Sequence, residues 1–107
     1  MKPEELSIIL SHLREELALI FGEQLVAVYL YGSQARGDAQ PDSDIDVMIV
    51  LRDAFDYFKV IERVSEITSR LSLENNTVIS CVYVTKNDYL HRRTPLLLNV
   101  RREGIGV

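Results

Sequence analysis

The sequence is poor in cysteine and has no long apolar run. Cys81 is the one cysteine in 107 residues, so no internal disulfide can form, and its apolar neighbours predict a buried thiol in a reducing cytoplasm. No Cys/His spacing of a zinc site occurs, and no run of about 18 apolar residues could cross a membrane. The acidic, amphipathic N-terminal stretch lacks the layout of a secretion signal. These absences predict a cytoplasmic domain with no membrane span.

Basic residues are also scarce outside the C-terminal part. The formal net charge is −4, and an acidic body argues against direct DNA binding, which depends on neutralising phosphates. Residues 86–107 are the exception, with five basic and two acidic side chains. This basic stretch is either a solvated helical face or a surface for a phosphate or an acidic partner.

No linker, repeat or low-complexity stretch divides the chain, so residues 1–107 form one domain of ordinary size. Apolar periodicity and capping residues predict an α/β (α+β) fold, a small mixed β-sheet flanked by helices in the order α-β-β-α-β-α-α. The predicted helices are Pro3–Phe21, Asp53–Leu73, Asn87–Arg92 and a last one from Pro95 to Gly104, and the predicted strands are Leu25–Tyr31, Ile45–Leu51 and Thr77–Val84.

Two aspartates open the second predicted strand. Asp44 and Asp46 are two residues apart, so their side chains project from the same face. Two neighbouring carboxylates repel each other unless a cation lies between them or one is protonated. Mg²⁺ is the usual cellular solution, because it takes a few carboxylate oxygens and completes its shell with water and substrate phosphates.

The segment Gly32–Ser43 supplies groups for those phosphates. Gly32 lets the backbone approach a ligand closely, Ser33 offers a hydroxyl and an N–H, and Arg36 a guanidinium suited to phosphate oxygens. No lysine occurs in this loop, which excludes the P-loop pattern. Each piece alone is common in turns. Together they predict a site for a nucleotide triphosphate and its metal.

The joint pattern YGSQARGDAQPDSDIDVMIV resembles the signature of the nucleotidyltransferase superfamily that includes DNA polymerase beta. It is most similar to the minimal nucleotidyltransferases, the MNT group. The resemblance implies transfer of a nucleotide, usually AMP from Mg-ATP, to a hydroxyl. It also implies that Gly32, Ser33 and Arg36 bind the phosphates, and that Asp44 and Asp46 hold Mg²⁺ as the catalytic pair.

The resemblance further implies a helical HEPN protein as partner, with this chain as the antitoxin of a toxin–antitoxin pair. A domain this small offers little protein surface on which an acceptor substrate could bind. We therefore expect the partner to present the acceptor hydroxyl. A second copy of the chain is an alternative partner. The apolar segment PLLLNV, residues 95–100, either covers the sheet or offers a surface for such a partner.

One expected group is missing. The superfamily usually has a third carboxylate on a later strand, and the equivalent stretch VISCVYV, residues 78–84, has Ser80 at its polar position instead. A serine is neither a comparable metal ligand nor a base near neutral pH. Three hypotheses follow: an enzyme whose third acid comes from Glu74, Asp88 or the partner; a nucleotide-binding antitoxin with weak or no transfer; or an interaction module in which the fold alone counts.

Overall fold

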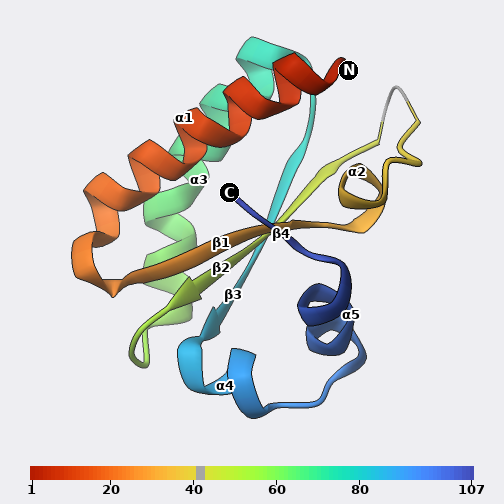
Figure 1. Ribbon diagram of the computed structural model, residues 1–107. Helices are drawn as coiled ribbons and strands as arrows, with labels where there is room; N and C mark the ends of the chain where they lie inside the picture. The colour runs from red at the N-terminus through yellow and green to blue at the C-terminus, as the bar shows by residue number, and fades with distance from the viewer. Residues whose placement is uncertain (41–42) are drawn as a thin grey trace.

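The computed structural model describes residues 1–40 and 43–107 as a four-stranded sheet with helices on both faces (Figure 1). The strand order is β3-β2-β1-β4; β2 and β3 are parallel, and β1 is antiparallel to both of its neighbours. This mixed sheet confirms the predicted fold class. The elements are α1 (Pro3–Phe21), η1 (Gly22–Gln24), β1 (Leu25–Tyr31), α2 (Gly32–Arg36), β2 (Ile45–Leu51), α3 (Tyr57–Asn75), β3 (Ile79–Thr85), α4 (Lys86–His91), α5 (Pro95–Glu103) and β4 (Ile105–Gly106).

The two faces of the sheet carry different helices. Figure 1 shows α1 and α3 side by side against one face, with α4 and α5 on the other. Ile45, Val47 and Ile49 of β2 pack into the larger core beneath α1 and α3. Met48 and Val50 of the same strand pack with Leu97 and Val100 of α5. The strand β2 is therefore covered on both sides, which explains its unbroken apolar run.

The start and the buried face of α3 differ from the prediction. Asp56, not Asp53, is the N-cap: its carboxylate accepts the N–H groups of Phe58 and Lys59, and the helix continues to Asn75. Phe58, an apolar residue of this helix that would suit a core position, is instead 81% exposed. The buried stripe is Val60, Val64, Ile67 and Leu71. Phe58 lies two residues before Val60, roughly 200° around the helix, so it points outward.

The C-terminal part of the sheet also differs. The strand β3 begins at Ile79 and ends at Thr85, and the two-residue strand β4 was not predicted, because so short a segment carries no alternation. In the expected loop Gly32–Ser43, α2 occupies the first residues, while Pro41 and Asp42 lie outside the described residues. No helix in the described part of the chain is long and apolar enough to span a membrane.

Candidate active site

Three side chains form a row across the sheet near the start of β2. Asp46 is paired with Tyr31 on β1 and with Ser80 on β3. Paired residues of neighbouring strands point to the same face. Tyr31 and the residues two beyond Asp46 and Ser80, Met48 and Val82, belong to the cluster beneath α5. Tyr31, Asp46 and Ser80 therefore share the face that α5 partly covers.

Gly32 meets the carboxylate of Asp46. Gly32 follows β1 directly and has φ +72°, a left-handed conformation that favours glycine. A Cβ atom at this position would lie 2.6 Å from Oδ2 of Asp46. No side chain larger than hydrogen fits there unless the carboxylate moves. Gly32 and Asp46, which the sequence places 14 positions apart, thus lie directly against each other.

The short helix α2 carries the other two predicted phosphate-binding residues. Ser33 is its second residue, and its carbonyl accepts the N–H groups of Gly37 and Asp38, which close the helix. Arg36 is the last residue of α2, and its guanidinium has two carboxylate neighbours. Nε lies 3.3 Å from Oδ2 of Asp38, and Nη1 lies 3.8 Å from Oε2 of Glu103 on α5.

The charges of the site act on one another. Burial, and next the negative charge of Asp44, raise the pKa of Asp46 above its ordinary value, while Arg36 opposes the shift. Burial and the charge of Asp46 likewise raise the pKa of Tyr31. Asp44 itself is exposed, just before β2, where the N–H of Ile45 donates to the carbonyl of Val78. The structure therefore brings Gly32, Arg36, Asp44 and Asp46 together, with Ser33 beside Gly32.

No acid on β3 completes the row. The position beside Asp46 is occupied by Ser80, as the sequence suggested. Asp88 follows the opposite end of β3, beyond Thr85, and its nearest cation is Arg92 at 3.9 Å. Glu74 lies near the end of α3 and lines a hollow together with residues of α1, in the helical layer on the other face. Neither acid is next to the aspartate pair.

The aspartate pair suits a hard divalent cation. Among the described residues, no group of three His, Cys, Asp or Glu side chains could hold a metal ion. Mg²⁺ does not need three, because one or two carboxylates with waters and substrate phosphates complete its shell. Burial, and next the charge of Asp44, raise the pKa of Asp46, and a divalent cation beside the two carboxylates would oppose both effects. Asp44 and Asp46 therefore fit Mg²⁺ that arrives with a nucleotide.

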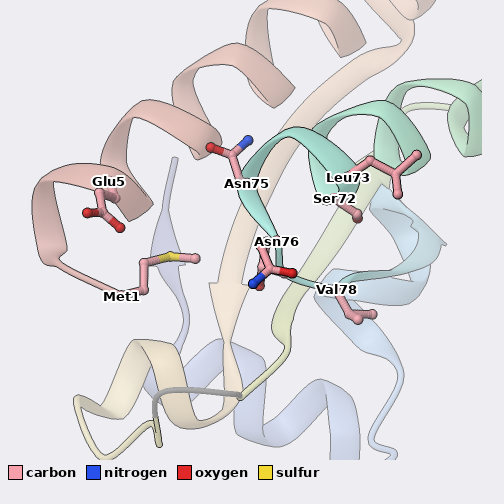
Figure 2. A pocket seen from close by; sticks show the side chains of 8 residues that line it. Met1, Glu5, Ser72, Leu73, Asn75, Asn76 and Val78 are labelled. Carbon is pink, nitrogen blue, oxygen red and sulfur yellow. The ribbon is translucent and has the colours of Figure 1, made fainter.

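A hollow of the surface lies away from this site. Figure 2 shows this cavity of about 700 Å³, between the start of α1, the end of α3 and the start of β3. Its lining includes Asn75, Asn76, Thr77 and Val78, with Glu5 as its charged member among the described residues. Among the described residues of this lining there is no Lys or Arg side chain that could hold a triphosphate as Arg36 could. The residues predicted to bind phosphates lie elsewhere, on α2.

Sequence reasoning missed two neighbours of the site. Tyr31, which the sequence places only at the end of a predicted strand, packs with the residues beneath α5 and also lies beside Asp46. Glu103 was counted only as one of two acids in the basic C-terminal stretch. Its closeness to Arg36 depends on β4, which returns the chain to β1, and no local pattern indicated that strand.

Comparisons with known proteins agree with this geometry. Residues 15–94 match the family model described as polymerase beta, nucleotidyltransferase. A relative from Methanocaldococcus jannaschii, named "Putative protein adenylyltransferase", is 32% identical over 78 residues, which cover 73% of this chain and 78% of the relative.

Two solved structures share the fold at lower identity. A chain of a toxin–antitoxin crystal structure with AMP-PNP superposes with a TM-score of 0.61 at 21% identity, covering 88% of this chain and 68% of the other. A chain of the tri-AMPylated Shewanella oneidensis HEPN toxin in complex with MNT antitoxin gives a TM-score of 0.55 at 20% identity, covering 99% and 71%. The family match spans β1 to β3, α2 and both aspartates, and the protein is therefore a member of the polymerase beta nucleotidyltransferase family.

Proposed function

We propose that this protein transfers AMP from Mg-ATP to a hydroxyl group of a partner protein. The observation that carries the proposal is the contact between Gly32 and Asp46, which unites the two halves of the motif in one site. A phosphate-binding turn and a carboxylate pair in contact are what phosphoryl chemistry with a divalent metal needs. The relative named as a protein adenylyltransferase supports AMP and a protein acceptor.

Each residue of the motif has a role in this proposal. Ser33 and the Gly32 backbone bind the β- and γ-phosphates, and Arg36 holds the charge of the departing pyrophosphate. Asp44 and Asp46 hold Mg²⁺, which supplies positive charge to the phosphate oxygens when it is bound. The acceptor oxygen forms a bond to the α-phosphorus as the bond to the pyrophosphate oxygen breaks, and the hydroxyl proton leaves to solvent.

We infer that the partner is a helical protein of the HEPN type and that this chain acts as its antitoxin. The structure with the tri-AMPylated HEPN toxin supports the pairing by its shared fold. Leu96 and Leu98 of α5 are 38% and 41% exposed and offer an apolar surface beside the site. The partner then presents the acceptor hydroxyl. A cytoplasmic location follows from that role.

Ser80 favours a second candidate function. Because no acid accompanies Asp46 on β3, the site lacks a built-in base for the acceptor hydroxyl. A protein with this site could bind Mg-nucleotide, transfer slowly or not at all, and neutralise its partner by contact. The retained Gly32, Arg36 and aspartates favour a site that still binds nucleotide in either case.

The test uses ATP labelled at the α-phosphate. The purified protein is mixed with Mg²⁺, labelled ATP and lysate of its own host, and the Asp44→Asn, Asp46→Asn double variant is the matched control. We expect a labelled protein band with the wild type and none with the variant. The size of that band identifies the acceptor.

Calorimetry separates the two candidate functions. No labelled band, together with Mg-ATP binding that the double variant loses, would establish the nucleotide-binding antitoxin instead. Equal Mg-ATP affinity in the wild type and in the double variant would refute both, because both place the metal on these aspartates.

A further inference from the structure

The C-terminal segment brings a carboxylate to the phosphate-binding side of the site. The strand β4 pairs antiparallel with β1, with Ile105 opposite Leu30 and Gly106 opposite Tyr29. Glu103, the last residue of α5, comes just before this pairing, and α2 begins just after β1, so both lie at the same end of β1. The chain can turn there because residue 104 is glycine: a Cβ atom would lie 2.5 Å from the carbonyl oxygen of Val100.

At this position the carboxylate of Glu103, like that of Asp38, lies close to the guanidinium of Arg36. Its Oε2 lies 3.8 Å from Nη1 of Arg36, and its Oε1 lies 3.5 Å from Nη2 of Arg102. Both distances exceed a good hydrogen bond, so the contacts are Coulombic and leave the geometry of Arg36 adjustable. The Glu103 side chain is 36% exposed, compared with 63% for Asp38, so it is the better shielded of the two acids around Arg36.

The location of Glu103 makes it unsuitable as the missing base. An attacking hydroxyl must approach the α-phosphorus from the side opposite the leaving pyrophosphate. Arg36 and α2 define the pyrophosphate side, next to β1, whereas Ser80 lies on the other side of Asp46, on β3. Glu103 belongs with the leaving group.

We propose that Glu103 is a positioning residue that sets how tightly Arg36 holds the phosphates of the nucleotide. This inference rests on the proposed function, since it needs a triphosphate at α2. Without nucleotide, the guanidinium of Arg36 lies between the carboxylates of Asp38 and of Glu103 on α5. When a triphosphate binds, its oxygens compete with Glu103 for the guanidinium of Arg36. Glu103 therefore weakens the attraction between Arg36 and the phosphates.

Removal of the charge at position 103 is the direct test. Calorimetry with Mg-ATP at one fixed ionic strength compares the wild type with Glu103→Gln, which keeps the shape of the side chain. We expect the variant to bind about three- to tenfold more tightly, the size of a partly exposed charge interaction. Glu103→Ala is expected to tighten binding as well. Glu62→Gln is the control, because it makes the same charge change on an exposed position of α3, across the sheet.

A double-variant cycle asks whether the effect passes through Arg36. In an Arg36→Gln background, Glu103→Gln is expected to give little or no gain in affinity, because the shared cation is gone. An equal gain in Mg-ATP affinity in both backgrounds would overturn the positioning role. Glu103 would then act only by direct repulsion of the phosphates. Unchanged or weaker binding by a Glu103→Gln protein that melts like the wild type would overturn the proposal altogether.

The Asp44→Asn, Asp46→Asn double variant distinguishes this failure from failure of the proposed function. If the wild type binds Mg-ATP, the double variant does not, and Glu103→Gln equals the wild type, then only the role of Glu103 is wrong. If the wild type itself does not bind Mg-ATP, the proposed function fails and this inference fails with it.

Discussion

At the scale of single residues, the site is an incomplete row of polar side chains. Asp46 has a tyrosine on one side and a serine on the other. Its raised pKa reflects burial and a neighbouring acid without a matching cation. The motif residues could be predicted from the sequence, because their spacing is local to one turn and one strand. Glu103 could not, because it reaches the site through a strand of two residues.

Replacement of Ser80 by aspartate should build the missing carboxylate. Ser80 and Asp46 are directly paired, so Ser80→Asp adds a like charge and should lower the free energy of unfolding by about 1 kcal/mol without metal. Mg²⁺ should reverse this loss and raise the melting temperature of the variant more than that of the wild type. Nucleotidyl transfer should increase by at least about tenfold.

The matched control for this change is Ser80→Asn, which has nearly the same shape and no charge. It should show neither the loss without metal nor the recovery with it. Equal responses of the two variants to Mg²⁺ would mean that position 80 does not face the metal.

At the scale of elements, helix starts illustrate the limits of sequence reasoning. The predicted helix begins at Asp53, and Asp56, three residues later, is the same residue type and equally able to cap a helix. The structure uses Asp56, while Asp53 contacts Gln24 and Arg52 at the end of β2. Apolar periodicity located the helix and most of its buried stripe, but its exact start depended on how the preceding turn fits the sheet.

The two aspartates provide a paired test of that assignment. Asp56→Ala should lower the free energy of unfolding by about 1 kcal/mol, because two backbone N–H groups of α3 lose their acceptor. Asp53→Ala should cost only a few tenths of a kcal/mol, since exposed ion pairs contribute little. Urea denaturation measures both, and a larger loss for Asp53→Ala would contradict the assignment of the cap.

At the scale of the whole molecule, the reactivity of the Cys81 thiol distinguishes the folded protein from the unfolded one. Cys81 on β3 packs against the larger core. The sequence predicted a buried thiol, whereas in the structure Cys81 is only partly buried. Burial raises the pKa of its thiol to about 12. The neutral thiol is favoured in the folded state, so its contribution to stability is complete below about pH 8.5 and is lost as the pH rises toward 12.

Alkylation of this thiol should therefore depend on unfolding. At pH 8 we expect iodoacetamide to modify Cys81 on the order of a thousandfold more slowly in the folded protein than in urea, because only the thiolate reacts. Mass spectrometry at intervals gives both rates. Fast labelling of a protein that still melts cooperatively would show that β3 opens without global unfolding.

The return of β4 to the edge of β1 has a consequence for biosynthesis. A growing polypeptide makes β1, α2 and β2 early, and these can already pair as neighbours in the chain. The outer strand and the acid beside Arg36 arrive only when residues 103–107 have been translated. Closure of the sheet edge and arrival of the acid beside Arg36 therefore coincide, and a ribosome-bound chain that ends before residue 103 would carry Arg36 without its counter-charge on α5.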